Sequence, residues 1–146
     1  MSVSDTVLPL VTARQIAHPW LCDVNGHLNT RHYQGFFDDA CQHLLAAAGF
    51  HGATENDGTG IVDARCVMEY LAEVAPGALV VIHSGFVKLG TKSVTSRHEM
   101  RSFDGQRLYA TSEHVSLFFD LKRRASMPIP DDFRADAQAL TIPVSE

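Results

Sequence analysis

A seven-residue segment from Asp23 to Asn29 combines a carboxylate, an imidazole, a glycine and two side-chain amides. Asp23 could act as a general base or as a nucleophile toward a carbonyl group. His27 could act as a base or polarise a carbonyl, and Asn29 could cap a helix or brace the loop. An aspartate in such a segment also commonly closes a turn. The segment is therefore a candidate catalytic loop, with a structural turn as the alternative.

A helical pattern starts directly after this loop and covers residues 30–48. Apolar residues recur there at i, i+3, i+4 and i+7, the spacing of one helical face. That face comprises Tyr33, Phe36, Phe37, Ala40, Cys41, Leu44, Leu45 and Ala48. Asn29 or Thr30 can cap the start, and Gly49 can end the helix. Because the first N–H groups of a helix lack internal acceptors, those near Thr30 and Arg31 could hold an oxyanion.

Two other kinds of chemistry are less favoured by the spacing. Asp23, His27 and His32 could ligate a metal, but there is no HExxH-type spacing, and we predict no metal site. Cys22 could be a nucleophile only with a basic partner and a lowered pKa. Neighbouring side chains of an extended segment point to opposite sides, so Cys22 and Asp23 cannot easily serve one site. We therefore favour Asp23.

Composition limits the functional classes. The 146 residues correspond to about one domain, and 45% apolar residues can form a core. A net charge of −5 argues against a nucleic-acid partner. Three cysteines without paired spacing (Cys22, Cys41 and Cys66) predict reduced thiols and a cytoplasmic location. Neither a signal peptide nor a membrane span is predicted from the apolar runs.

Five stretches show the alternation of strands. They are residues 10–18, 61–75, 78–89, 92–103 and 106–119. Their ends are marked by Pro19, Pro76-Gly77, Gly90-Thr91 and Asp104-Gly105. The order of one strand, one helix and four strands predicts an α+β domain over residues 1–146, in which an antiparallel sheet encloses the helix. Its core spans about residues 10–121, and residues 122–146 form a tail. Open sheet edges favour dimerisation edge to edge.

Several other polar residues have an ordinary surface or packing role as their first interpretation. Alternation along residues 61–75 predicts that Glu69 and Glu73 face solvent. The strand histidines are His83, His98 and His114, for which we expect packing or exposure. The basic residues Lys88, Lys92, Arg123 and Arg124 could gather around a phosphorylated ligand or could each be solvated.

The pattern Asp23-x-x-Gly26-His27-x-Asn29-x-x-x-Tyr33 resembles the hotdog-fold acyl-CoA thioesterases of the 4-hydroxybenzoyl-CoA thioesterase type. The resemblance continues in order through residues 70–77, 89–93 and 110–120, and then Arg123-Arg124 followed by Met127-Pro128, so that it covers about residues 10–130. The form Trp20-x-x-Asp23-x-Asn25-Gly26-His27 is most similar to a branch that includes betainyl-CoA and carnitine-pathway thioesterases.

This resemblance implies a hotdog fold, a five-stranded antiparallel sheet around one long helix. It implies an active site at the interface of a homodimer, which can assemble further into a homotetramer. It also implies hydrolysis of a coenzyme A thioester to a free acid and CoA, without a metal or cofactor. Asp23 would be the base or nucleophile, the N–H near Thr30 the oxyanion donor, and His27 and Asn29 would shape the site. We predict substrate contacts from Trp20, Tyr33, Glu69, Lys92, Ser93, Arg123 and Arg124, with Lys92 and Ser93 near the CoA phosphates.

Two alternatives share the predicted fold. A hydratase or dehydratase would use a histidine with a carboxylate, such as His27 with Asp23, and a non-catalytic acyl-CoA-binding dimer would use neither. The acyl group cannot be assigned from spacing. A quaternary ammonium group would favour aromatic faces or carboxylates, and Trp20, Asp63 and Glu69 are the candidates for these contacts. Apolar walls are expected from Tyr33, Phe36, Phe37, Met68 and Tyr70.

Overall fold

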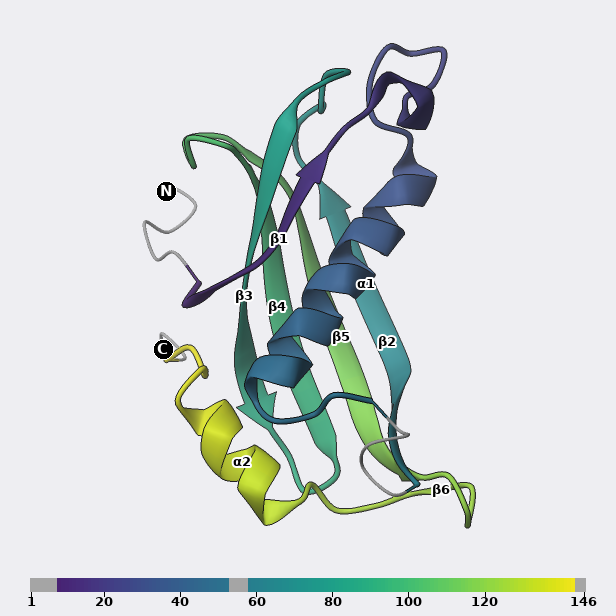
Figure 1. Cartoon of the computed structure of the whole chain (residues 1–146), viewed down its shortest axis with the longest axis vertical. Helices are drawn as coiled ribbons and strands as arrows, with labels where there is room; N and C mark the ends of the chain where they lie inside the picture. Colours follow the sequence, from purple (N-terminus) through teal and green to yellow (C-terminus); the bar gives the residue numbers. More distant parts are fainter. Residues whose placement is uncertain (1–7, 53–57, 144–146) are drawn as a thin grey trace.

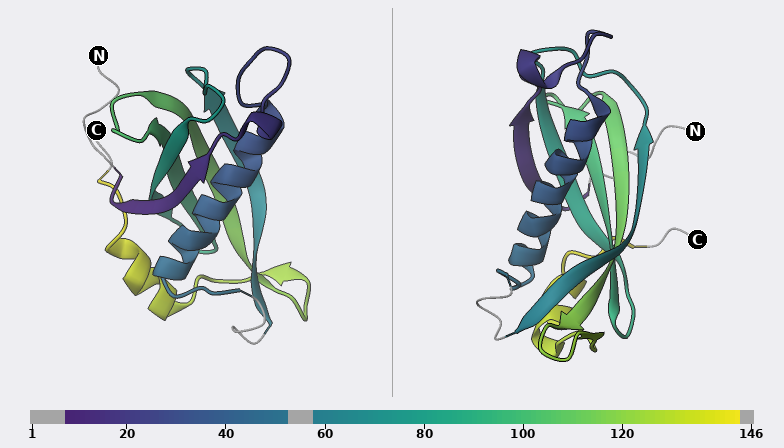
Figure 2. Two further views of the ribbon diagram at one scale, coloured as in Figure 1. Left: turned by 45° about the horizontal axis from the view of Figure 1, so that its top comes forward. Right: turned by 90° about the vertical axis from the view of Figure 1, so that its right-hand side faces the viewer.

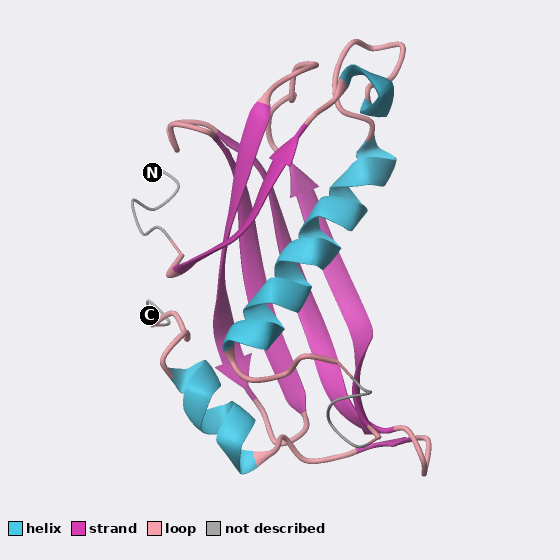
Figure 3. Cartoon of the chain, viewed as in Figure 1, coloured by secondary structure: helices cyan, strands magenta, loops and turns pink. Residues whose placement is uncertain are grey.

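A computed structural model describes residues 8–52 and 58–143 of the chain. The chain folds as a curved antiparallel sheet with one long helix across its concave face and a short helix near the C-terminus (Figures 1 and 3). In chain order the elements are β1 (Leu10–Ile16), the 3₁₀ helix η1 (Pro19–Leu21), α1 (Thr30–Ala47), β2 (Thr59–Tyr70), β3 (Leu79–Leu89), β4 (Ser93–Ser102), β5 (Leu108–Asp120), β6 (Ala125–Ser126) and α2 (Asp131–Gln138).

The sheet has six strands, in the order β1-β3-β4-β5-β2, with the short β6 paired to β5. The prediction of five strands is therefore wrong by one, since the two-residue β6 in the C-terminal segment carries no detectable alternation. The α+β class and the antiparallel arrangement are confirmed. Strand β2 lies at one edge of the sheet, and α1 packs against β1, β3 and β4 (Figure 2).

Helix α1 forms where the periodicity predicts it. Its first turn is capped by Asn29, whose Oδ1 accepts the backbone N–H of Arg31 at 3.0 Å. Gly49, with φ of +93°, follows the helix in the left-handed conformation that favours glycine. The apolar face is buried against the sheet, and Phe37, Ala40 and Leu44 are fully inaccessible to solvent.

A row of polar side chains crosses the core beneath α1. We call Thr12, Ser84, His98 and Ser96 the buried polar row. Thr12 Oγ1 lies 2.7 Å from Ser84 Oγ, Ser84 Oγ contacts His98 Nδ1, and His98 Nε2 lies 3.0 Å from Ser96 Oγ. The ring of His114 stands edge-on to that of His98, with centroids 5.0 Å apart. Burial, with a smaller contribution from His114, lowers the pKa of His98 to about 3, and burial also lowers the pKa of His114.

We expect the free energy of unfolding to decrease as the pH falls below about 6.5. In that range the unfolded chain binds protons at His98 and His114 that the folded chain binds less readily. The stabilisation is complete above pH 6.5 and is lost as the pH falls toward 3, with a slope of roughly 1.4 kcal/mol per pH unit for a fully shifted histidine. Urea unfolding between about pH 7 and pH 5 measures this slope, and His98→Gln, which cannot titrate, is expected to flatten it. An unchanged slope in His98→Gln would contradict the assignment.

The strand predicted over residues 61–75 ends five residues earlier, at Tyr70. Beyond it, the N–H groups of Leu71 and Ala72 both donate to Tyr109 O, and the chain leaves the sheet. Val74 O then accepts the N–H of Leu28 at 2.8 Å, which ties this segment to the Asp23 loop. The alternation of apolar residues therefore continues past the end of the ladder.

The C-terminal segment, which the sequence suggested was a tail, contains α2. Phe133 of this helix is buried, and its ring packs against those of Phe86 and Phe118. Downstream, Ile142 donates its backbone N–H to Phe86 O. Residues of the tail thus cover one end of the core and extend the sheet beside β3.

Candidate active site

The loop from Asp23 to Asn29 is fixed at both ends by backbone hydrogen bonds. Asp23 N donates to His27 O, and Gly26, with φ of +81°, donates to Asp23 O. Leu28 is buried and paired with Cys22 in an isolated bridge, and Asn29 N donates to Leu21 O at 3.0 Å. These bonds give the loop one conformation at the start of α1.

Both carboxylate oxygens of Asp23 accept hydrogen bonds. Oδ1 accepts the backbone N–H of Asn25 at 2.9 Å, and Oδ2 accepts the side-chain amide of Asn29 at 3.1 Å. The turn-closing role and the site role are thus compatible, because a carboxylate has more lone pairs than these two bonds use. Asn29 holds the carboxylate with its amide nitrogen and caps α1 with its oxygen.

The first N–H groups of α1 differ in availability. The N–H of Arg31 is taken by Asn29 Oδ1, and that of His32 by Asn29 O. In the part of the chain that the structure describes, the N–H of Thr30 has no acceptor. Of the two groups considered from sequence, Thr30 is therefore the one that can donate to a ligand at the positive end of the helix.

A pocket of about 230 Å³ opens beside this helix end. It is lined by His27, Leu28, Thr30, Tyr33, Tyr70, Leu71, Ala72 and Glu73. The rings of Tyr33 and Tyr70 meet edge to face at 5.0 Å. Burial, followed by the nearby Tyr70 and Asp23, raises the pKa of Tyr33. Among the described residues, Glu73 is the carboxylate that lines the pocket, Asp23 is not one of its lining residues, and no lysine or arginine lines it.

Glu73 is the site residue that sequence reasoning missed. On a continuous strand it would face solvent, and its side chain is 78% exposed as predicted; beyond the end of β2 at Tyr70 it also lines the pocket, where its Oε1 lies 3.8 Å from His27 Nε2. Its position in the segment 70–77, which matched the family pattern, was the available signal.

Cysteine chemistry at Cys41 or Cys22 has little support in the geometry. Burial raises the pKa of Cys41 to about 12, so this thiol stays protonated. Cys22 Sγ lies against the carbonyl oxygens of Ala17 and His18, at 3.9 and 3.6 Å, and no base contacts it. Among the described residues, no three His, Cys, Asp or Glu side chains are arranged to hold a metal ion.

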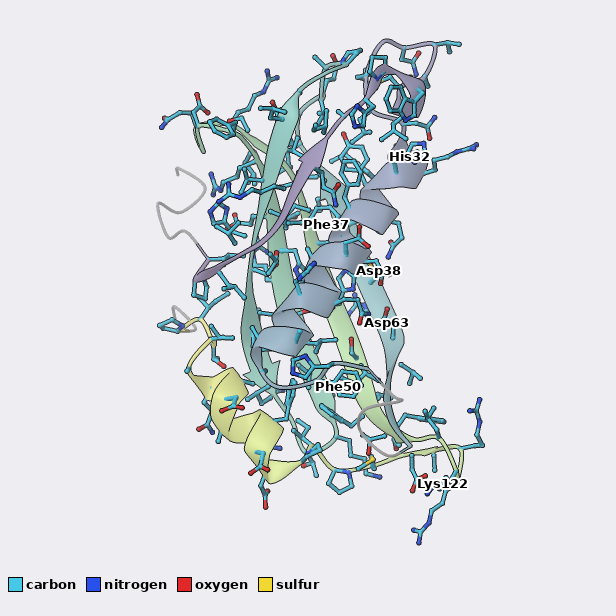
Figure 4. All side chains as sticks on the ribbon, viewed as in Figure 1. His32, Phe37, Asp38, Phe50, Asp63 and Lys122 are labelled. Atoms are coloured by element: carbon cyan, nitrogen blue, oxygen red, sulfur yellow. The ribbon has the colours of Figure 1, made fainter. Side chains whose placement is uncertain are left out.

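The basic residues predicted to meet CoA phosphates lie at the opposite end of the sheet from the Asp23 loop. In the pairing of β2 with β5, Tyr70 lies opposite Ala110 near the site, whereas Thr59 lies opposite Asp120 at the far end of β2. Lys92 precedes β4 at that far end, where Ser93 pairs with Leu117, and Arg123 and Arg124 follow Asp120. The 12 residues of β2 span roughly 36 Å. Figure 4 shows the same separation between His32, near the start of α1, and Lys122.

Two further predicted contacts lie outside the pocket. Glu69 pairs with Thr111 on the convex face of the sheet, which points away from α1. Trp20, in η1, is 74% exposed, and its ring stacks on His18 with centroids 4.3 Å apart and planes 7° from parallel. The structure thus brings together Asp23, His27, Asn29, Thr30 and Tyr33, with Trp20 nearby.

Residues 17–136 match the family model of the thioesterase-like superfamily. The chain belongs to this superfamily. Within the described residues of this thioesterase-like chain, α1 and α2 are both too short or too polar to cross a bilayer.

Relatives of this thioesterase-like chain support the same family and fold. L-carnitine dehydrogenase/betainyl-CoA thioesterase from Agrobacterium fabrum is 27% identical over 108 residues, which are 74% of this chain and 22% of that protein. The chain thus spans about a fifth of the curated relative's length. A 1,4-dihydroxy-2-naphthoyl-CoA thioesterase from Synechocystis superposes with a TM-score of 0.77 at 11% identity, covering 88% of this chain and 95% of that one. A Staphylococcus aureus protein solved in complex with CoA superposes with a TM-score of 0.84 at 17% identity, covering 98% and 93%. These superpositions confirm the hotdog-like fold.

Proposed function

We propose that the protein hydrolyses the thioester bond of an acyl-CoA, with Asp23 as the reactive carboxylate. The observation that carries this proposal is the Asp23 carboxylate, which Asn25 and Asn29 hold in the loop that leads into α1, where the N–H of Thr30 has no acceptor among the described residues. A carboxylate that can attack or activate water, next to a donor for the developing oxyanion, is the minimum that thioester hydrolysis needs.

Two routes are open to this arrangement. In the first, Asp23 takes a proton from water while the water oxygen bonds to the thioester carbonyl carbon. The carbonyl oxygen gains negative charge, which the Thr30 N–H stabilises. The carbon–sulfur bond then breaks, and the CoA thiolate takes up a proton. In the second, the Asp23 oxygen itself bonds to the carbonyl carbon, the carbon–sulfur bond breaks, and the CoA thiolate leaves and takes up a proton from solvent. Water then hydrolyses the resulting anhydride, which restores the Asp23 carboxylate and releases the acid. Both routes yield a free acid and CoA.

The proposed active form is a homodimer that pairs along β2. Among the described residues, no strand covers the outer edge of β2, and Val62, Val67 and Tyr70 of this strand are exposed. An unpaired, partly apolar edge is a template for a second strand. Two copies of β2 pairing antiparallel about a two-fold axis would place the far end of one chain beside the near end of the other.

Pairing along β2 explains how residues predicted to serve one site can lie at opposite ends of the sheet within one chain. The second copy's segment 122–124 follows Asp120, which pairs with Thr59 at the start of β2. The two-fold axis would bring that segment close to Tyr70 and the Asp23 loop of the first copy. Lys122, Arg123 and Arg124 would then meet the phosphates of a CoA whose thioester lies at the other chain's Asp23, and Lys92 and Ser93 lie at the same end. The site would be incomplete in one copy.

Thiol release from a panel of acyl-CoA thioesters tests the proposed activity. The panel contains short aliphatic, long aliphatic, aromatic, and betainyl or carnitinyl thioesters. Turnover of one class supports the thioesterase assignment. Water addition to an enoyl-CoA would instead favour a hydratase on the same fold, and CoA binding without turnover would favour a non-catalytic binding dimer.

We also propose that the acyl group is small and carries a quaternary ammonium, as in betainyl-CoA. The Agrobacterium relative is named for that substrate. The pocket of about 230 Å³ presents two tyrosine rings and the Glu73 carboxylate, without a cationic side chain of Lys or Arg. Trimethylammonium groups favour such aromatic faces and a nearby negative charge. Glu69, a carboxylate considered for this role from sequence, points away from the pocket. We assign the carboxylate contact with the ammonium group to Glu73 instead.

Betainyl-CoA is therefore expected to be a better substrate than 3,3-dimethylbutanoyl-CoA, its neutral isostere. A cation–π contact together with Glu73 should favour the cation by about 10-fold or more in kcat/KM. Glu73→Gln keeps the shape of the side chain and is expected to reduce that preference several-fold, mainly through betainyl-CoA. Glu69→Gln, on the convex face, serves as the matched control. Equal kcat/KM for the two substrates would contradict the cationic acyl group while leaving the hydrolase assignment in place.

A further inference from the structure

Trp20 is a largely exposed aromatic residue whose ring packs on the ring of His18. It is the only tryptophan of the chain, and 74% of its surface is accessible to solvent. Its ring lies flat on the ring of His18, so that the opposite face of the indole is open. A single exposed apolar residue needs no explanation by itself, but a flat ring held against a second ring, with its own surface largely accessible, offers a face on which a planar ligand can stack.

The stacked pair is fixed relative to the site. Pro19 begins η1, Leu21 N donates to His18 O at 2.8 Å, and Cys22 N donates to Pro19 O at 3.1 Å. On one side Ala17 N donates to Ala78 O, next to β3. On the other side Leu21 O accepts the N–H of Asn29, the residue that caps α1 and holds Asp23. The backbone that carries Trp20 is therefore tied to the segment that holds Asp23.

We propose that Trp20, supported by His18, is a stacking platform for the adenine ring of the CoA thioester. The proposal rests on the proposed function. Every nucleobase has a flat π-face that stacks on exposed aromatic rings without requiring a charged contact. The pair offers such a face at the same end of the molecule as the Asp23 loop (Figure 1).

The position of Trp20 outside the pocket suits a contact with the nucleotide end of the substrate better than a contact with the acyl end. Trp20 does not line the pocket that Thr30, Tyr33 and Tyr70 form, where the acyl group would enter. The acyl group and the adenine sit at opposite ends of the pantetheine arm, so a ring outside the pocket mouth suits the adenine. In the proposed dimer the basic segment 122–124 of the second copy would lie at this same end and hold the phosphates between.

Fluorescence tests the platform without any catalysis, because all tryptophan emission comes from Trp20. The full-length protein is titrated with CoA, with adenosine 3′,5′-bisphosphate, with pantetheine, with inorganic pyrophosphate and with betaine. We expect saturable quenching by CoA and by the adenosine bisphosphate, and no change with pantetheine or pyrophosphate. Quenching by pantetheine, or none with CoA at concentrations that saturate binding in a calorimetric titration, would overturn the proposal. Quenching by betaine alone would instead assign Trp20 to an acyl cation.

Kinetics give a second, independent readout. Trp20→Ala is expected to raise KM for an acyl-CoA by about 5- to 150-fold, the range for loss of one base–aromatic stack. For the same acyl group on pantetheine, which lacks the base, we expect less than a roughly 2-fold change. Trp20→Phe should recover most of the loss, and Phe103→Ala is a control at another exposed ring, 68% accessible. Equal effects of Trp20→Ala on both thioesters would overturn the platform. If the wild type turns over neither thioester, the proposed hydrolase fails, and the fluorescence titration still decides the platform.

Discussion

Asp23→Asn is expected to lower kcat for thioester hydrolysis by about 10²- to 10⁴-fold, the usual contribution of a positioned general base. The amide can neither accept the proton of water nor attack the carbonyl carbon. Its oxygen can still accept the N–H of Asn25, so that the turn is retained, while the bond to the amide of Asn29 is weakened or reversed. Thiol release under saturating substrate measures the loss.

The controls for this variant separate chemistry from folding. Binding of CoA, followed by calorimetry, should stay within a few-fold of the wild type, and the thermal midpoint should move little. Asn25→Ala removes a side chain of the same loop and leaves the backbone donor to Asp23 in place. Unchanged turnover in Asp23→Asn would remove Asp23 from the reaction. In the wild type, a burst of thiol equal to the enzyme concentration would identify the covalent route.

Mixed dimers are expected to recover activity that neither parent variant has. One parent carries Asp23→Asn. The other carries Arg123→Ser and Arg124→Asn, and it should show a KM for acyl-CoA raised by roughly 100-fold through the loss of two phosphate contacts. Asparagine is chosen at Arg124 because this residue has φ of +58°, which asparagine tolerates. If each site combines the loop of one chain with the basic segment of the other, a purified heterodimer has one intact site and about half of wild-type activity.

The same experiment discriminates the alternative arrangement. If each chain builds its site alone, the heterodimer contains one chain without the carboxylate and one without the arginines, and no intact site forms. Tagging the two variants differently and purifying on both tags supplies the heterodimer. Arg107→Ser removes a positive charge at the other end of β5 and serves as the control. No recovery of activity in mixed dimers is expected from this variant. Recovery below a few per cent would rule out a site shared between chains.

The helix and the loop could be predicted from sequence because both signals are local. One apolar face over four turns fixes α1, and Asn29 marks its start by a side chain that caps only there. The position of Asp23 close to the helix N-terminus follows from that start. The residues alone left Thr30 and Arg31 open as oxyanion donors, and the family resemblance favoured Thr30; which N–H the cap side chain accepts is a matter of geometry within a single turn.

The end of β2 and the contact of Glu73 with His27 could not be predicted because they depend on distant contacts. Alternation continues through Ala72 and Val74, but the N–H of Ala72 shares Tyr109 O of β5 with the N–H of Leu71, and Val74 O accepts the N–H of Leu28, so the β2–β5 ladder stops. The segment that forms α2 was missed for a related reason. Only Phe133 and Ala137 of its residues are buried, and so small an apolar face carries little periodic signal. Its stability comes from packing on Phe86 and Phe118.

The buried polar row is expected to couple the substitutions of residues on three strands during evolution. Thr12, Ser84, His98 and Ser96 satisfy one another's hydrogen bonds in a region without solvent. Losing one member leaves its neighbour's donor or acceptor unpaired at a cost of about 1–3 kcal/mol, whereas exchanging all of them for apolar groups of similar shape can be nearly neutral. Substitution within the row is thus expected to be concerted. A lineage would cross between the polar and the apolar core only through several coordinated changes, and single steps along that path would be selected against.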